Sequence, residues 1–235
     1  MKRDNVYVCF SGPICAGKDT IIDLLRARGN LEPLLEPEHQ VFYLSEAINH
    51  DTAVLDAYYQ DQNRTGIPFE LATLCTRLVL ASSIPKKQGI VIGNRHIIEA
   101  RHTFVEYAQR TRDTKADPFF REAEGYYDSL LHIALKNGTL PIPDITFYLD
   151  VSDPEIILKR NRTRNAAGEG SINTEYLKGI TEEFRRYIAN FEQIHQNWSV
   201  KSPRLKVFDA SVKKEGLAKI AEECEKIIGE AYRQR

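Results

Sequence analysis

A glycine-rich segment near the start of the chain, FSGPICAGKDT (10–20), constrains the fold more than any other part of the sequence. Gly12, Gly17 and Lys18 have the spacing G-x-x-x-x-G-K, between a β-type apolar run and a pattern typical of a helix. Glycines at these positions let backbone N–H groups surround phosphate oxygens, and the helix N-terminus and the lysine add positive charge. The sequence therefore predicts a phosphate-binding loop between the first strand and the first helix.

Asp19 follows the lysine, at the position where a Ser or Thr hydroxyl normally ligates Mg²⁺. Two interpretations stay open. Either Asp19 holds the metal, directly or through water, and Thr20 supplies a hydroxyl, or Asp19 only caps the helix that begins here. The nucleotide-binding residues predicted from the loop are Gly12, Ala16, Gly17, Lys18, Asp19 and Thr20.

Short apolar runs alternate with longer helical patterns along the chain. The runs are nearly continuous in apolar character, as in parallel strands buried on both faces, and they cover residues 6–11, 41–45, 90–94, 145–150 and 205–210. This alternation predicts an α/β fold, a P-loop-type three-layer sandwich with helices on both faces of a five-stranded parallel sheet. We predict one domain over residues 1–235, in which the polar stretch 159–173 is a mobile loop.

The overall composition excludes several classes of protein. The chain has 235 residues and a formal net charge of −1, which argues against a strongly basic nucleic-acid surface. No run approaches the roughly 18 apolar residues of a membrane span, and the first strand-like run is too short for a signal peptide. The four cysteines include no Cys-x-x-Cys pair, which favours reduced thiols. We therefore expect a cytoplasmic protein that binds neither a membrane nor a nucleic-acid polymer.

Later segments, together with the glycine loop, resemble a known enzyme family. They are SEAINHD (45–51), YYQDQNRTGIPFELATLCTRL (58–78), GNRHIIEARHTF (93–104) and KRNRTR (159–164). Their order and spacing, from about residue 5 to residue 210, resemble those of the deoxynucleoside kinases, which include the deoxycytidine, deoxyguanosine and multisubstrate kinases. The resemblance implies transfer of the γ-phosphoryl group of ATP, with Mg²⁺, to the 5′-hydroxyl of a deoxynucleoside. It also implies a homodimer.

The resemblance further implies roles for residues near the reacting oxygen. Glu46 matches the general base that takes the proton of the 5′-hydroxyl, and Arg95 matches an arginine close to that oxygen. Tyr59 matches the tyrosine that holds the 3′-hydroxyl of the sugar. The alternative is that Glu46 caps a helix and Tyr59 is a core aromatic residue. The catalytic residues predicted are Lys18, Glu46, Arg95, Arg160, Arg162 and Arg164.

Another group of residues matches the family's base-binding positions. Glu70 takes the place of a base-reading glutamine, with Phe69 beside it, and Phe104 matches a phenylalanine that packs against the base. Phe104 is also compatible with a core position. Ala100 replaces an aspartate that some members use near the base. The substrate-binding residues predicted are Glu46, Tyr59, Phe69, Glu70, Arg95, Ala100, Arg101, Phe104 and Glu169.

A lid and an adenine-binding segment complete the resemblance. The arginines of KRNRTR match lid arginines that close over the donor phosphates and neutralise charge during transfer, although a solvated charged turn is the alternative. Glu169 matches a lid carboxylate that reaches the 3′-hydroxyl. Asp209, within FDAS (208–211), belongs to a segment that resembles the one contacting the adenine of ATP.

Two departures from the family carry hypotheses. Asn94 stands where the family has a glutamate close to the metal, whereas Asp19 adds a carboxylate nearby. We hypothesise a ligand exchange in which Asp19, Thr20 and Asn94 surround Mg²⁺. The second departure is Glu70: an ionised glutamate only accepts hydrogen bonds, and guanine presents the adjacent donors N1–H and the 2-amino group. This predicts a preference for deoxyguanosine or another 2-aminopurine nucleoside, unless Glu70 pairs with Arg64, Arg77 or Arg95 instead.

Two other functions stay open at this point. A nucleoside monophosphate kinase is one, because loops ending in Lys-Asp-Thr also occur there and Arg64, Arg95 and Arg101 offer positive charge for an acceptor phosphate. Glu46 argues against it, since a carboxylate would repel that phosphate. The other is a nucleotide-binding protein without turnover, for which the changes at Asp19 and Asn94 are the reason.

Overall fold

The structure, a computed structural model, describes residues 4–44, 52–111, 118–151, 153–164 and 172–235. Its centre is a sheet of five parallel strands in the order β2-β3-β1-β4-β5. The strands are β1 (Asn5–Ser11), β2 (Gln40–Tyr43), β3 (Gly89–Asn94), β4 (Ile145–Asp150) and β5 (Arg204–Asp209). The predicted sheet is confirmed, and the strand ends lie within one or two residues of the predicted ones.

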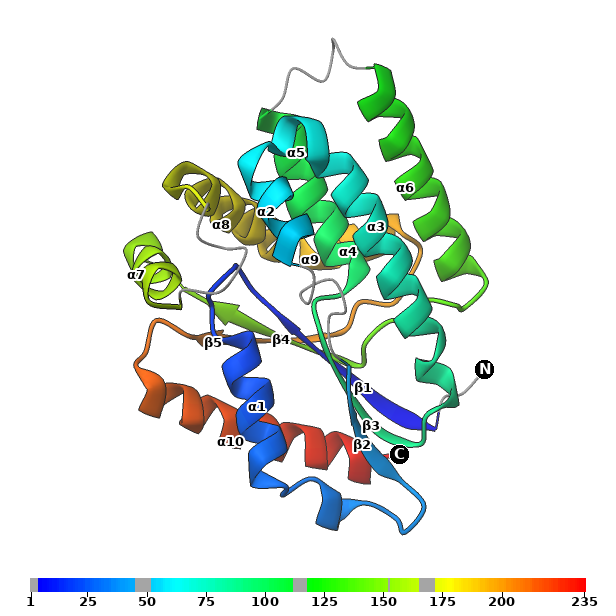
Figure 1. The fold of residues 1–235 in the computed structure, drawn as a ribbon. Coiled ribbons are helices and arrows are strands. Elements are labelled where there is room, and N and C mark those ends of the chain that lie inside the picture. Colours follow the sequence, from blue (N-terminus) through cyan, green and yellow to red (C-terminus); the bar gives the residue numbers. More distant parts are fainter. Residues whose placement is uncertain (1–3, 45–51, 112–117, 152, 165–171) are drawn as a thin grey trace.

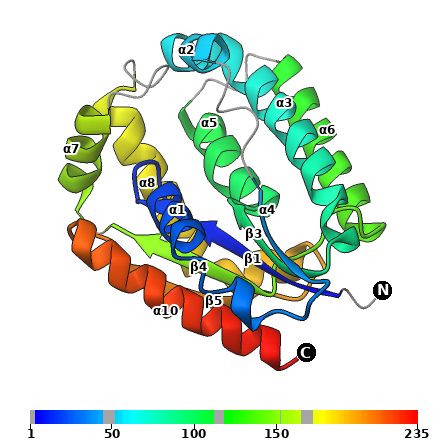
Figure 2. The same cartoon turned by 60° about the horizontal axis from the view of Figure 1, so that its bottom comes forward.

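Helices cover both faces of the sheet, and Figures 1 and 2 show the three layers. One layer contains α1 (Lys18–Arg28) and α10 (Lys214–Arg233), which pack against each other. The opposite layer contains α3 (Gln62–Ser82), α4 (Ile97–Ala100), the π-helical turn η4 (Arg101–Val105), α5 (Glu106–Thr111), α6 (Pro118–Lys136), α8 (Thr174–Ala189) and α9 (Phe191–Asn197). The remaining helical elements are η1 (Glu32–Leu34), α2 (Thr52–Gln60), η3 (Ile84–Lys86) and α7 (Pro154–Arg164). The predicted sandwich is confirmed.

In the described part of the chain, no helix is both long enough and apolar enough to cross a bilayer.

Alternate residues of the central strand β1 enter two hydrophobic clusters. Phe10 belongs to a cluster that includes Leu25 of α1, whereas Tyr7 belongs to one that includes Leu74 of α3 and Leu131 of α6. Successive strand residues point to opposite faces, so a strand covered by helices on both sides needs apolar residues at consecutive positions. This explains the continuous apolar runs that predicted the strands.

The register of β1 and β3 fixes the position of the glycine loop. Phe10 pairs with Asn94, so the two strands end side by side. The loop that follows β1 therefore lies beside the segment that follows β3. Residues of GPICAGKDT and GNRHIIEARHTF, far apart in the sequence, meet at this edge of the sheet.

The expectation of a loop from residue 159 onward is wrong for its first part. Residues 159–164 continue α7, which ends at Arg164. The stretch KRNRTR contains neither glycine nor proline, and lysine and arginine favour helix, so the charged composition does not interrupt the helix. Residues 165–171 of the predicted loop lie outside the described residues.

Candidate functional site

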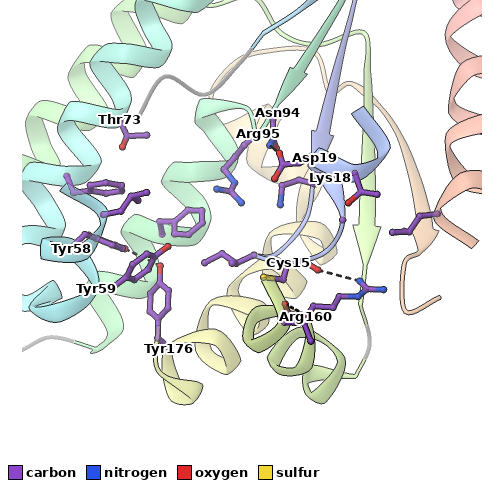
Figure 3. Close-up of a pocket in the computed structure, with 18 of the residues that line it drawn as sticks. Cys15, Lys18, Asp19, Tyr58, Tyr59, Thr73, Asn94, Arg95, Arg160 and Tyr176 are labelled. Atoms are coloured by element: carbon purple, nitrogen blue, oxygen red, sulfur yellow. Dashed lines mark hydrogen bonds between the residues drawn. The ribbon is translucent and has the colours of Figure 1, made fainter. Parts of the chain in front are cut away.

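A cavity of about 570 Å³ opens beside the carboxyl ends of β1 and β3. Its walls come from the glycine loop, from α1, α2 and α3, from η4, α7 and α8, and from the start of α10. Figure 3 shows side chains from these elements gathered around it. Crevices outside the carboxyl ends of parallel strands are where open α/β sheets bind ligands.

The glycine loop has the backbone conformation that its sequence predicts. Gly12 and Gly17 have φ angles of 136° and 102°, and a Cβ on Gly12 would lie only 2.7 Å from the carbonyl oxygen of Leu149. Lys18 begins α1 and is buried, and its Nζ donates to the carbonyl oxygens of Gly12 and Pro13 at 2.8 Å each. The ammonium group is thus folded into the loop at the edge of the cavity.

The two residues of the hypothesised ligand exchange are in contact. Nδ2 of Asn94 donates to Oδ1 of Asp19 at 2.8 Å, and both residues line the cavity with Thr20. Oδ1 of Asn94 is buried and has no hydrogen-bond partner among the described residues. A carboxylate, an amide oxygen and a hydroxyl are oxygen ligands of the type that Mg²⁺ binds. The residues present therefore fit a magnesium ion.

Arg95 lines the cavity at the end of β3. Its backbone is left-handed, with φ of 59°, and its N–H donates to the carbonyl oxygen of Phe10 at 2.8 Å. The carbon of its guanidinium group lies 4.6 Å from the centre of the Phe104 ring, and Nε lies 3.2 Å from Oε1 of Glu99. A left-handed non-glycine residue is unfavourable unless its surroundings hold it. Arg95 and Phe104, predicted from different family positions, form one unit of the cavity wall.

One face of α3 lines another part of the cavity. Phe69, Glu70, Thr73 and Arg77 all contribute to the wall, and Glu70 and Thr73 are buried. Oγ1 of Thr73 has no hydrogen-bond partner within the described segments. Sequence reasoning identified Phe69 and Glu70 but missed Thr73, and it treated Arg77 only as a possible pairing partner. Thr73 and Arg77 follow Glu70 by three and seven residues, so on a helix they lie on the same face as Glu70. This spacing is the sequence signal that identifies both residues.

Tyrosines cover the side of the cavity between α2 and α8. Tyr59 lines the cavity, together with Tyr58 and Tyr176, which the sequence did not single out. The hydroxyl oxygens of Tyr58 and Tyr176 are 3.1 Å apart, and the Tyr58 ring stacks on Phe69 with centroids 4.3 Å apart. Burial raises the pKa of Tyr176 well above its ordinary value, so its hydroxyl stays neutral. Tyr176 reaches the cavity only through tertiary folding and has no local signal in the sequence.

Arg160 binds backbone carbonyl groups at the edge of the cavity. Its Nη2 donates to the carbonyl oxygens of Ala210 and Val212 at 2.8 Å and 2.7 Å, and its Nη1 lies 3.4 Å from those of Cys15 and Ala16. Burial lowers the pKa of Arg160. One side chain thus connects α7 to the glycine loop and to the segment that follows β5.

Several other predicted residues lie away from the cavity wall or outside the described residues. Ala100 is buried in the core, and Arg162 is exposed on α7. Arg101 donates from Nη2 to Glu124 and Asp128 of α6, at 2.8 Å and 2.9 Å. Oδ1 of Asp209 accepts the N–H of Ser211 at 2.9 Å, and the cavity wall nearby is formed by Val212, Lys213, Lys214 and Leu217. Glu46, Glu169 and the side chain of Arg164 lie outside the described residues.

Comparison with known proteins gives one family. The model of the family "Deoxynucleoside kinase" matches residues 8–231. Mitochondrial thymidine kinase 2 of Macaca fascicularis is 26% identical over 200 residues, which cover 85% of this chain and 66% of that protein. Deoxyguanosine kinase of Dictyostelium discoideum is 24% identical over 195 residues, which cover 81% of this chain and 61% of that protein. The chain thus spans somewhat less than two thirds of the length of these relatives.

Solved structures show the same fold. A structure of deoxyadenosine kinase from M. mycoides with bound dATP superposes with a TM-score of 0.67 at 17% identity, covering 93% of this chain and 98% of that one. The structure of that kinase with the products dCMP and a flexible dCDP bound gives a TM-score of 0.68 at 16% identity, with 94% of this chain and 100% of that one covered.

Proposed function

Because the chain belongs to the deoxynucleoside kinase family, we propose that it transfers the γ-phosphoryl group of ATP to the 5′-hydroxyl of a deoxynucleoside. The observation that carries the proposal is the composition of a single cavity. A phosphate loop with its lysine lines one part of it, and a buried acid among aromatic rings lines another. A triphosphate suits the first part, and a sugar and base suit the second.

The phosphate loop supports binding of the donor triphosphate. Backbone N–H groups between Gly12 and Lys18 and the N-terminus of α1 favour anionic oxygens, and Nζ of Lys18 lies beside them as a cationic donor. Asp19, Thr20 and Asn94 would hold Mg²⁺, which neutralises the charge of the β- and γ-phosphates when it is bound. Arg95 supplies positive charge next to the loop. The roles of Glu46 as base and of Arg162 and Arg164 as lid residues stay predictions.

The α3 face supports a guanine base. Ionised Glu70 accepts hydrogen bonds and therefore matches N1–H and the 2-amino group of guanine. Arg77 on the same face is a donor, and arginine binds O6 and N7 of guanine in a bidentate manner. The aromatic rings of Phe69 and Phe104 provide surfaces for the flat base. Together these groups suit deoxyguanosine better than thymidine, whose carbonyl oxygens would face the Glu70 carboxylate.

An ADP-release assay over a panel of acceptors tests the proposal. The panel contains the four common deoxynucleosides, guanosine, and the corresponding monophosphates. We expect ADP with deoxynucleosides and the highest kcat/KM with deoxyguanosine. ADP with monophosphates alone would make the protein a nucleoside monophosphate kinase, and no ADP with any acceptor would make it a nucleotide-binding protein without turnover. Near-equal kcat/KM for deoxyguanosine and thymidine would reject the guanine preference but leave the kinase assignment standing.

We also propose that two copies of the chain pair through α3 and α6. Val79 on α3 is 72% exposed, and Tyr126 and Ile133 on α6 are 66% and 57% exposed. The two helices pack against each other and lie side by side in both views (Figures 1 and 2). Light scattering should give the mass of a dimer, and Ile133→Asp should give a monomer; a monomeric parent protein at micromolar concentration contradicts the proposal.

A cytoplasmic location stays a prediction.

A further inference from the structure

Glu99 is a buried carboxylate that neither the glycine loop nor the family resemblance singled out. It lies on α4, four residues after Arg95, and only 1% of its surface is exposed. Its Oε1 lies 3.2 Å from Nε of Arg95. Burying an ionised carboxylate is costly unless charged or hydrogen-bonding partners compensate, so this position calls for an explanation.

Contacts on several sides restrict the guanidinium group of Arg95. One face lies over the Phe104 ring, with the ring of Phe184 at 5.7 Å, and Nη2 is 3.5 Å from the carbonyl oxygen of Gly12. Glu99 binds the Nε edge. A guanidinium group is planar and its donors form a rigid fork, so a bond at one edge fixes the direction of the others. Figure 3 shows Arg95 projecting into the cavity from beside the loop.

The groups that act on Glu99 include three cations of the cavity wall. Burial raises the pKa of Glu99 above its ordinary value, and Arg95, Ser11, Lys18 and Arg77, in that order, oppose the rise. Lys18, Arg77 and Arg95 all line the cavity. The chain also has an amide, Asn94, rather than a carboxylate directly before Arg95. The Glu99 carboxyl group thus lies behind the cations that face the cavity.

We infer that Glu99 is a positioning residue for phosphoryl transfer, which holds the Nε edge of Arg95 so that its Nη groups face the reacting oxygens. The inference rests on the proposed function, specifically on the role of Arg95. Its consequence is that Glu99 contributes to turnover through Arg95 alone. Substrate affinity, which depends on the α3 face and on the glycine loop, should depend much less on Glu99.

A double-mutant cycle of Arg95→Ala and Glu99→Gln tests this inference. Glutamine keeps the shape of the side chain and removes its charge. We expect Glu99→Gln to lower kcat by about 10- to 100-fold, the cost of misplacing a group at the reacting centre, with KM for ATP and nucleoside within about 3-fold. In the Arg95→Ala background the same change should lower kcat by less than about 2-fold, because the group that Glu99 positions is already gone.

A matched control separates positioning from general stability. Glu183 on α8 is 3% exposed and also pairs with arginines, with Oε1 2.8 Å from Nη1 of Arg186, but it does not line the cavity. Glu183→Gln should lower Tm without changing kcat. If Glu99→Gln does not fold, Glu99→Asp keeps the charge, shortens the reach and serves in the same cycle.

Each result has a distinct meaning. Equal losses from Glu99→Gln with and without Arg95 overturn the inference, because Glu99 then acts independently of Arg95. Normal kcat in Glu99→Gln together with a large loss in Arg95→Ala overturns the inference but leaves the role of Arg95 intact. Normal kcat in Arg95→Ala overturns the proposed role of Arg95 and the inference with it.

Discussion

The proposed phosphate-binding part and the proposed nucleoside-binding part of the cavity are built in different ways. A single short segment, GPICAGKDT, forms most of the phosphate-binding part through its backbone and Lys18. The nucleoside-binding part is formed by side chains of α2, α3, η4 and α8, which come from distant parts of the chain. A site made of local backbone needs particular glycines at fixed spacing, whereas a site made of distant side chains depends on how the helices pack.

The two parts also differ in chemistry. Cationic groups concentrate at the phosphate-binding part, where Lys18, Arg95 and Arg160 all bind carbonyl oxygens of the glycine loop. Aromatic rings and the buried Glu70 dominate the nucleoside-binding part. We expect the first type of surface to accept any nucleoside triphosphate and the second to discriminate between bases. Substitutions in the two parts should therefore have different kinetic signatures.

Lys18→Ala should have the largest effect. The ammonium group lies in the glycine loop, where the β- and γ-phosphates would bind, and removing one such group from a transition state costs about 100- to 1,000-fold in kcat. Steady-state ADP release measures it, with deoxyguanosine as acceptor. The ranking of acceptors should not change, because Nζ of Lys18 binds carbonyl oxygens of the glycine loop rather than the base-binding residues proposed on α3. Lys178→Ala, on the exposed side of α8, serves as the charge-matched control and should keep full activity. If Lys18→Ala keeps the kcat of the parent protein, the lysine of the glycine loop does not contribute to catalysis.

Glu70→Gln should instead change the preference among acceptors. Glutamine replaces one acceptor by a donor, so the pocket loses its match to the two guanine donors and gains one to adenine or cytosine. We expect the ratio of kcat/KM for deoxyguanosine to that for deoxycytidine or deoxyadenosine to fall by about 10- to 100-fold. The KM for ATP should stay unchanged. An unchanged acceptor ratio would mean that Glu70 pairs inside the protein rather than with the base.

Asp19→Ser tests the proposed magnesium ligands in the phosphate-binding part. Removing the carboxylate beside Asn94 should raise the Mg²⁺ concentration for half-maximal activity by about 10-fold, as loss of a metal-orienting or metal-binding group typically does. Adding Asn94→Glu in the same chain should recover most of the loss, because it returns a carboxylate to the neighbouring position. Magnesium titrations of the single and double variants measure both effects. If kcat and Mg²⁺ dependence barely change in Asp19→Ser, the carboxylate only stabilises the first turn of α1, whose N-cap is Gly17.

The sequence predicted the sheet, the layers and the loop because these depend on local patterns. Apolar runs, glycine spacing and strand–helix alternation are set by neighbouring residues, and the strands lie within one or two residues of their expected positions. The prediction of a loop at the end of α7 is wrong, because the charged segment contains no helix breaker and continues the helix. Glu99 and Tyr176 were missed for a different reason. Their burial and partners follow from how α4 and α8 pack in the folded chain, and no local pattern encodes that packing.

Arg95 and Arg101 show that matching a family's sequence pattern does not by itself place a residue in the site. Both belong to GNRHIIEARHTF, and both were predicted to contact substrate. In the structure Arg95 lines the cavity, whereas the described residues that line it do not include Arg101. Arg101 instead pairs with Glu124 and Asp128 of α6, and its guanidinium group is largely buried there. The π-helical turn that begins at Arg101 changes the side on which the following side chains emerge.

Arg101→Met should therefore change activity least. Loss of the charge-assisted hydrogen bonds to α6 should cost about 2 kcal/mol of unfolding free energy, or roughly 4 to 8 °C in Tm. The kcat/KM for deoxyguanosine should stay within about 3-fold of the parent value. The reason is that the contacts of Arg95 in the cavity do not involve Arg101 or its partners on α6. Arg185→Met, whose partner Glu182 is exposed, controls for loss of a surface charge and should leave Tm nearly unchanged. A Tm equal to that of the parent with a 10-fold higher KM for the nucleoside would place Arg101 with the nucleoside-binding part instead, and would mean that the α6 pair opens when substrate binds.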